Sequence, residues 1–147
     1  TEVLLFAASR AQLVRHVIIP ALEKGTIVIC DRFADSTTAY QGYGRGFAID
    51  QMLAINQFAI DGAVPNLTLL LDVDVNLGFQ RVAERHKASS GACDRIEREA
   101  KAFHEKVRNG YLELARQWPE RVKIVNAQAS ADHVEQDIWR SVENVLP

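Results

Sequence analysis

Apolar and polar positions alternate with a helical period at the start of the chain. Apolar side chains recur three or four positions apart from Val3 to Leu22, and the pattern stops before Gly25, a residue that commonly follows a helix. Pro20 lies inside this pattern and has no backbone N–H to donate, so we expect a kink or break close to it. The pattern therefore predicts a long amphipathic helix that is interrupted near Pro20.

Three short apolar runs predict strands, and the first of them, which is β-branched and has no polar alternation, is typical of a strand buried on both faces. They cover residues 26–30, 67–71 and 122–125. Segments with helical spacing separate them, and strands that alternate with helices favour a parallel sheet. The sequence therefore predicts an α/β fold.

The remaining helices and loops follow from capping residues and from composition. Gly42–Gly46 is expected to be a flexible loop, and 87–92, which is small and polar, is expected to be a mobile one. A helix is expected at 50–60, capped by Asp50 and ended by Gly62, and another at 76–85. A third is expected to begin at Asp94, with Phe103, Val107 and Tyr111 on one face. The last is expected at 132–145, capped by Asp132.

Composition narrows the class of protein. The chain has 147 residues, about the length of one domain, and its 48% hydrophobic content can supply a core. A net charge of -2 gives no general attraction to nucleic acid or to an anionic membrane. No apolar run approaches the roughly 20 residues of a membrane helix. Cys30 and Cys93 do not suggest a disulfide framework or a zinc site, so we expect a soluble protein of a reducing cytoplasm.

Asp31 and Arg32 directly follow the first predicted strand and form the most informative pair in the chain. Ligands of parallel α/β sheets bind at the carboxyl ends of strands. An arginine offers a planar fork of donors to phosphate, and a carboxylate can hold Mg²⁺ directly or through water. The pair therefore predicts a phosphorylated ligand. The alternative is that Asp31 caps a helix and Arg32 is a solvated surface charge.

The segment Asp31–Gly46, with Asp-Arg-Phe followed by Ala-Tyr-Gln-Gly and Gly-Arg-Gly, resembles thymidylate kinase, the enzyme that phosphorylates dTMP with ATP. Other blocks match the family in the expected order: Phe6–Leu13, Pro65–Val73, Asp94–Glu97 and Tyr111–Ala115. The last two resemble the bacterial branch of the family. The resemblance spans nearly the whole chain. It implies a P-loop-kinase-like three-layer fold with a parallel sheet.

One family element is missing from the sequence. The family opens with a phosphate-binding loop, Gly-x-x-x-x-Gly-Lys-Ser/Thr, that cradles the donor phosphates, and none of the eight glycines here lies in such a pattern. That loop and the family's central first strand would precede Thr1. We therefore expect residues 1–147 to be the C-terminal portion of a single thymidylate-kinase domain. Without the central strand, the strands at 26–30 and 67–71 would each have an unpaired edge.

The resemblance assigns dTMP-binding roles to residues of the first half of the chain. Phe6 would stack on thymine and Arg10, on the same helix face, would hydrogen-bond the base. Arg32 would bind the 5′-phosphate, and Tyr40 would lie against the deoxyribose. Thr37, with Ser36 beside it, would contact the base, and Gln41 and Arg45 are weaker candidates. Asp31 would lie near Mg²⁺. For Phe6 and Tyr40, the alternative is ordinary packing.

A basic cluster surrounds the predicted loop, in a lid region at about 81–98. Arginines delivered by a closing lid stabilise the charge that spreads over a transferred phosphoryl group. Arg85 and Arg95 are the catalytic candidates of this region, together with Arg32, and Tyr111 would close over the nucleotide. The alternative for such a cluster is a solvated helix face paired with neighbouring glutamates.

The resemblance implies ATP and dTMP as substrates, Mg²⁺ as the cofactor, a role in dTTP biosynthesis, and a homodimer. The dimer would use the apolar faces of the helices that contain Leu13 and Val17, and Leu53 and Phe58. Two alternatives remain open. One is a related deoxynucleoside kinase, and the other is a catalytically inactive fragment that binds dTMP or serves dimerisation.

Overall fold

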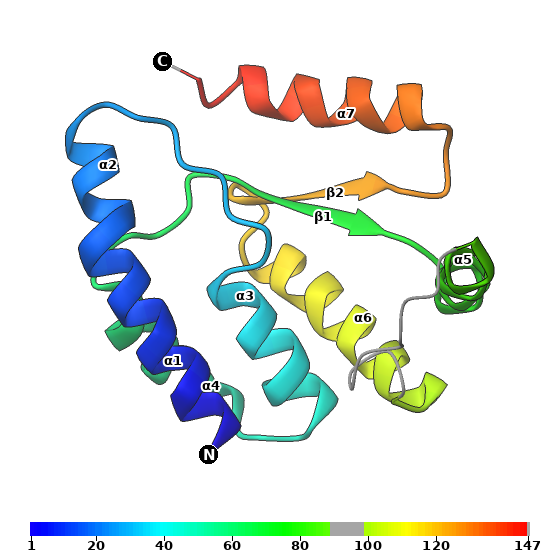
Figure 1. Cartoon of the computed structure of the whole chain (residues 1–147), viewed down its shortest axis with the longest axis horizontal. Helices are drawn as coiled ribbons and strands as arrows, with labels where there is room; N and C mark the ends of the chain where they lie inside the picture. Colours follow the sequence, from blue (N-terminus) through cyan, green and yellow to red (C-terminus); the bar gives the residue numbers. More distant parts are fainter. Residues whose placement is uncertain (89–98, 147) are drawn as a thin grey trace. The chain divides into compact units, whose positions relative to one another are not determined.

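The computed structural model describes residues 1–88 and 99–146. The chain divides into two compact units, Thr1–Pro65 and Asn66–Pro147. Figure 1 labels the helices and strands of both units.

The first unit begins with one continuous helical rod. It consists of α1 (Glu2–Leu13), a π-helical segment η1 (Val14–Ile18) and α2 (Ile19–Glu23). The predicted helix is therefore confirmed, and the irregularity expected near Pro20 is the π-helical turn that precedes it, where Ile19 N–H donates to the carbonyl of Val14. The buried side chains are Val3, Ala7, Val14 and Ile18, spaced on one face.

Residues 26–30, predicted as a buried strand, form no strand in this structure. Ile27 is 62% exposed and Ile29 is 91% exposed. A strand needs a hydrogen-bonded neighbour, and the sheet in the described part of the chain contains only β1 and β2. The prediction of a strand here is therefore wrong, because the β-branched pattern of the segment is not matched by a neighbour that could pair with it.

A second helical rod and a third helix complete the first unit. The rod consists of α3 (Ala34–Thr37) and the π-helical segment η2 (Thr38–Gly44), so the loop predicted at Gly42–Gly46 is helical for its first half. Helix α4 (Ile49–Ile60) packs against α1, α3 and η2. Its N-cap is Ala48, with Asp50 inside the first turn, and the left-handed Asp61 precedes Gly62 at its end. A Cβ at Gly42 would approach Ile49 Cδ1 to 2.7 Å, so glycine allows η2 to lie close to α4.

The second unit is built on two parallel strands, β1 (Thr68–Asp72) and β2 (Val122–Asn126), paired in register from Thr68 with Val122 to Asp72 with Asn126. The connection contains α5 (Val75–Ala88) and α6 (Lys101–Gln117), and α7 (Ala131–Glu143) follows β2. Helices α6 and α7 lie on opposite sides of the strand pair (Figure 1). The α/β class and the parallel pairing of these strands are confirmed.

Some predicted helix ends differ in the second unit. Ser130 caps α7, because its hydroxyl accepts from His133 N–H, and Asp132 lies in the first turn. Lys87 and Ala88 belong to α5, so the predicted loop does not begin at residue 87. The helix start predicted at Asp94 and the rest of that loop lie outside the described residues.

The rod Glu2–Glu23 has the length and composition of a membrane-spanning helix, with a mean hydropathy of 1.3. The expectation that no segment approaches that length is therefore corrected. Core helices of soluble proteins share these properties. In this structure Val3, Ala7 and Val14 of the rod are buried, and Arg10 donates hydrogen bonds to polar side chains of α3 and α4. Both features are typical of a helix packed within a globular unit.

Candidate functional site

Arg32 has a backbone conformation that few residues adopt. Its φ is 66°, in the left-handed region, where a non-glycine residue costs on the order of 1–3 kcal/mol and is commonly retained at binding sites. The guanidinium lies over the ring of Tyr40, with Cζ 5.0 Å from the ring centroid. The exposed residue is thus held in a defined orientation at the start of the segment that carries most of the predicted site.

Arg10 is the centre of a hydrogen-bond network inside the first unit. Its Nη1 donates to Asn56 Oδ1 at 2.9 Å, and its Nη2 donates to Thr37 Oγ1 at 2.6 Å and to the Phe33 carbonyl at 3.3 Å. The guanidinium also lies over the Phe33 ring. Burial lowers the pKa of Arg10, and the nearby Asp35 acts in the opposite direction. These contacts fix a partly desolvated cation in one place.

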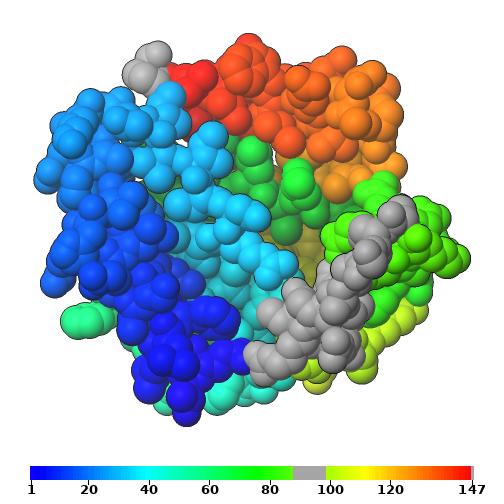
Figure 2. Space-filling model, in the orientation of Figure 1, coloured from blue at the N-terminus to red at the C-terminus, as the bar shows by residue number. Residues whose placement is uncertain are grey.

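Phe6 precedes Arg10 by four residues on α1, so their side chains share a face of the helix. It is 45% exposed, whereas its neighbours Val3 and Ala7 are buried. The structure therefore presents an aromatic side chain next to an immobilised cation. Figure 2 shows the blue N-terminal helix and the cyan segment that follows it at the surface of the molecule.

The other predicted contacts of the first unit differ in their accessibility. Thr37 is buried and accepts the bond from Arg10, and Ser36 is half-buried. Gln41 is 4% exposed and donates to Glu2 Oε1 at 2.9 Å, so it ties η2 to the start of α1. Arg45 lies 3.7 Å from the same carboxylate oxygen. Gln41 and Arg45 therefore join elements on which other site residues lie.

Asp31 is the predicted metal ligand. Its side chain is exposed, and no group of three or more potential metal-binding side chains occurs among residues 1–88 and 99–146. Mg²⁺ commonly keeps several waters and is held by one or two carboxylates together with substrate phosphates. A single exposed aspartate beside Arg32, the arginine predicted to bind phosphate, fits this mode of binding.

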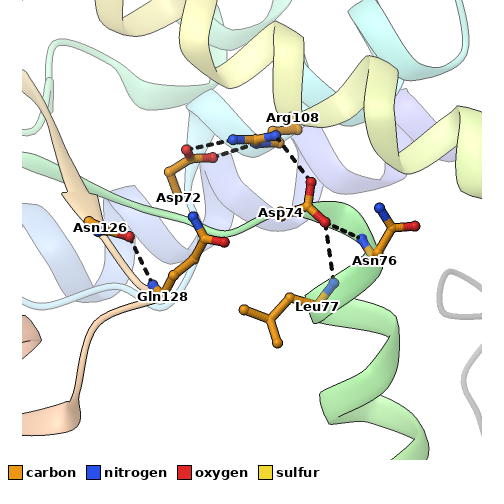
Figure 3. Close-up of polar contacts among 7 residues, drawn as sticks. All are labelled: Asp72, Asp74, Asn76, Leu77, Arg108, Asn126 and Gln128. Atoms are coloured by element: carbon orange, nitrogen blue, oxygen red, sulfur yellow. Dashed lines mark hydrogen bonds and ion pairs between the residues drawn. The ribbon is translucent and has the colours of Figure 1, made fainter.

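The second unit contains a carboxylate cluster at the carboxyl end of β1, shown in Figure 3. Arg108 of α6 donates two hydrogen bonds to Asp72, from Nε to Oδ1 at 2.7 Å and from Nη2 to Oδ2 at 2.9 Å. Its Nη1 lies 4.0 Å from the carboxylate of Asp74. Asp74 accepts from the N–H groups of Asn76 and Leu77 and so caps α5. One arginine thereby links the strand end to two helices.

The pKa of the Asp72 carboxyl is held below its usual range, mainly by the hydrogen bonds from Arg108, and the pKa of Arg108 is raised by the same bonds. A carboxyl group with a lowered pKa stabilises the fold above its unfolded-state pKa, and this contribution disappears as the pH falls through the folded-state pKa. The pair is therefore expected to stabilise the second unit at neutral pH and to lose its effect below pH 3.8.

Replacing Arg108 with methionine is expected to lower the free energy of unfolding by about 1 kcal/mol at pH 7, since the pair is partly solvent-exposed. The difference from wild type should shrink as the pH falls below 3.8. Urea unfolding at pH 7 and pH 3 measures both quantities. Arg116→Met, which breaks an exposed i,i+3 pair with Glu113, is the matched control and should have little effect at either pH. Equal losses for both variants would contradict the assignment.

The lid candidates of the second unit are only partly described. Arg85 lies in the last turn of α5 and is exposed, and Tyr111 lies on α6, half-buried, three residues after Arg108. Arg81 donates to the carbonyl of Ala127 at 2.9 Å. Arg95 and most of the region at 81–98 beyond α5 lie outside the described residues, so the structure does not test the catalytic role predicted there.

The parallel α/β architecture, the oriented Arg32, and the cation beside an exposed aromatic ring fit a nucleotide-binding enzyme of the phosphoryl-transfer class. Comparison with known proteins agrees, because the family model for thymidylate kinase matches residues 1–138. The chain belongs to the thymidylate kinase family, a family of nucleoside monophosphate kinases. The predicted resemblance and enzyme class are therefore confirmed.

Individual relatives are similar along almost the whole chain. A thymidylate kinase of Clostridium novyi is 46% identical over 138 residues, which cover 94% of this chain and 66% of that relative. One from Syntrophotalea carbinolica is 47% identical over 146 residues, 99% of this chain and 68% of the relative. One from Deinococcus radiodurans is 47% identical over 141 residues, 96% of this chain and 66% of the relative. The chain thus spans about two thirds of the length of these relatives.

Two structurally central residues were not predicted as part of any site. Asn56 is an amide in the inward-facing stripe of α4 that also carries Met52 and Ala59, and a polar residue within such a stripe is a signal for a buried hydrogen bond. Arg108 is the second. The sequence signal for it was weak, because nothing local pairs a residue of α6 with the end of a strand 36 positions earlier.

Proposed function

We propose that the full-length protein transfers the γ-phosphoryl group of ATP to dTMP, giving dTDP for dTTP biosynthesis, and that residues 1–147 supply the acceptor site and part of the lid. The observation that carries this proposal is the fixed position of Arg10, beside exposed Phe6 and bonded to Thr37. A planar base can stack on the ring while the cation donates to its carbonyl oxygen. Family membership supports the substrate.

In this proposal the acceptor nucleotide contacts both helical rods of the first unit. Arg32 binds the 5′-phosphate with charge-assisted hydrogen bonds, and Tyr40, whose ring the guanidinium already touches, borders the deoxyribose. Thr37 and Ser36 lie near the base. Gln41 and Arg45 act through Glu2 to hold α1 against η2. These residues bind and orient, and none is required to form a covalent intermediate.

Mg²⁺ accompanies ATP in this proposal and supplies charge neutralisation at the phosphates, with Asp31 as the nearby carboxylate of this chain. Arg85, Arg95 and Tyr111 belong to the lid and shield the reacting phosphates from water. The assignment of these three residues rests on the resemblance to the family.

An ADP-release assay of the full-length protein tests the proposal. With ATP and Mg²⁺, turnover is expected with dTMP and to be far lower with thymidine, because thymidine lacks the phosphate that Arg32 would bind. Turnover with thymidine but not with dTMP would instead indicate a deoxynucleoside kinase. Binding of dTMP without turnover would support the inactive-fragment alternative for the form assayed.

We further propose that the protein is a cytoplasmic homodimer that needs neither nucleic acid nor a membrane. Support for the dimer comes from exposed apolar side chains on the first rod and on α4: Leu5 is 65% exposed, Val17 55% and Phe58 88%. Exposed apolar surface of this kind is typical of a protein interface. The small net charge supports the proposal that neither nucleic acid nor a membrane is needed. The absence of a cysteine framework supports a reducing cytoplasm.

Replacing Val17 with glutamate is expected to dissociate the dimer, because a charge at an apolar interface would be desolvated without a partner. Sedimentation velocity of the full-length protein measures the result. Gln128→Glu adds the same charge at an exposed position in the turn after β2, outside the two proposed interface helices, and serves as the control. A wild-type protein that sediments as a monomer would contradict the dimer, and a Val17→Glu variant that remains dimeric would exclude this helix from the interface.

A further inference from the structure

Asn56 is a buried polar residue at the point where the helices of the first unit meet. It is 4% exposed and lies on the inward face of α4, near Met52, Ala59 and Ile60. An unbonded amide in such a place would cost on the order of 1–3 kcal/mol, so its partners carry information about why it is there.

Every partner of the Asn56 side chain belongs to a segment that carries the acceptor site. Oδ1 accepts from Arg10 Nη1 at 2.9 Å, and Nδ2 donates to the Ala34 carbonyl at 2.9 Å and to Thr38 Oγ1 at 3.0 Å. The orientation of the amide is fixed by chemistry, because a guanidinium has no acceptor atoms and must face the oxygen. Asn56 therefore fastens Arg10 to the helical rod that begins with α3.

The hydrogen-bond partners of Arg10 in the described structure are all neutral. They are the Asn56 amide, the Thr37 hydroxyl and the Phe33 carbonyl. A neutral acceptor fixes the direction of a guanidinium without compensating its charge, whereas a bidentate carboxylate would both orient and neutralise it. Asp35 is near enough to raise the pKa of Arg10, so the charge is partly compensated, but the hydrogen bonds that orient the guanidinium go to neutral acceptors.

We propose that Asn56 is a positioning residue for recognition of the dTMP base and that it acts through Arg10. This inference rests on the function proposed above. Asn56 holds the guanidinium in the one orientation in which it can donate to a carbonyl oxygen of a thymine stacked on Phe6. It does not contact the phosphates, so it affects acceptor binding and leaves the rate of phosphoryl transfer at saturation nearly unchanged.

Two substitutions separate positioning from packing. Asn56→Leu keeps the approximate volume and removes the acceptor, and Asn56→Asp keeps an oxygen facing Arg10 but removes the donor to Ala34 and Thr38. In the full-length protein we expect the KM for dTMP to rise about tenfold in Asn56→Leu. In Asn56→Asp it should rise less, by about threefold, because the carboxylate still orients Arg10 but compensates part of its charge. We expect kcat to change less than twofold in both variants. Gln57→Leu, the adjacent exposed amide on α4, is the control and should match wild type.

A double-mutant cycle tests whether Asn56 acts through Arg10. Arg10→Ala alone should weaken dTMP binding more than Asn56→Leu alone, and the double variant should bind dTMP no worse than Arg10→Ala within about twofold, since the second change removes support for a side chain already absent. Losses that multiply in the double variant would overturn the inference. So would an Asn56→Asp variant whose KM rises as much as that of Asn56→Leu.

Failure of this inference can be told apart from failure of the proposed function. If the wild-type protein does not bind or phosphorylate dTMP, the function itself is wrong. If wild type is active and Asn56→Leu has an unchanged KM for dTMP, only the role of Asn56 is wrong. Thermal unfolding reports folding for each variant, and Asn56→Ser, whose hydroxyl is too short to reach Arg10, replaces Asn56→Leu should that variant not fold.

Discussion

Replacing Arg32 with alanine is expected to weaken dTMP binding to the full-length protein by roughly 1.5–3 kcal/mol, which is the usual loss for a charge-assisted contact. The physical reason is the geometry of this residue. Its left-handed backbone and its position over Tyr40 hold the guanidinium in place before a ligand arrives. Little conformational entropy is then lost when a phosphate binds. Isothermal titration with dTMP measures the change.

A matched control and a second ligand sharpen this measurement. Arg116→Ala removes the same charge from an exposed surface position, where the side chain pairs with Glu113 one turn earlier on α6, and should leave dTMP affinity unchanged. Thymidine lacks the phosphate, so its weaker binding should be the same for wild type and Arg32→Ala. An Arg32→Ala variant that binds dTMP as tightly as wild type would exclude Arg32 as the residue that binds the 5′-phosphate.

The second large effect is expected in the core of the other unit. Leu114 of α6 is 1% exposed, and α6 packs against the strand pair, in which Val122 and Val125 of β2 are also buried. Truncating a fully buried leucine to alanine removes apolar contact and leaves a cavity, so Leu114→Ala should lower the free energy of unfolding by about 2–5 kcal/mol. Urea unfolding followed by circular dichroism measures this loss.

The control for this prediction lies two residues away on the same helix, on a different face. Leu112 is half-buried, so Leu112→Ala should cost clearly less, because part of its surface remains in water in the folded state. A loss below about 1 kcal/mol for Leu114→Ala would mean that α6 does not form part of the core as described.

Periodicity predicted most helices and both strands of the sheet, because each of these elements has a local pattern that its packing satisfies. The pattern at 67–71 and at 122–125 is matched by a parallel partner in register. Residues 26–30 are equally apolar but have no partner strand in the described part of the chain, and Ile29 is 91% exposed. A strand is defined by its neighbour, so its own residues can predict the tendency to form one but not the pairing.

The candidate site divides in the same way. The spacing of Phe6 and Arg10 alone places them on one helix face. The position of Asp31 and Arg32 after an apolar run predicts that they face a ligand. The partners of Arg10 could not, because Thr37 and Asn56 are 27 and 46 positions away and are brought near only by helix packing. Gln41, predicted to touch substrate, is buried against Glu2 instead of lying at an open surface. Its contribution to binding stays a prediction.

We expect the first unit to hold the acceptor nucleotide between its two helical rods. A crystal structure of the full-length protein with dTMP tests this directly. It should show the thymine ring stacked on Phe6, a base carbonyl oxygen within hydrogen-bonding distance of Arg10, and the 5′-phosphate at the guanidinium of Arg32. A nucleotide bound elsewhere, or bound here with its phosphate away from Arg32, would exclude this binding mode.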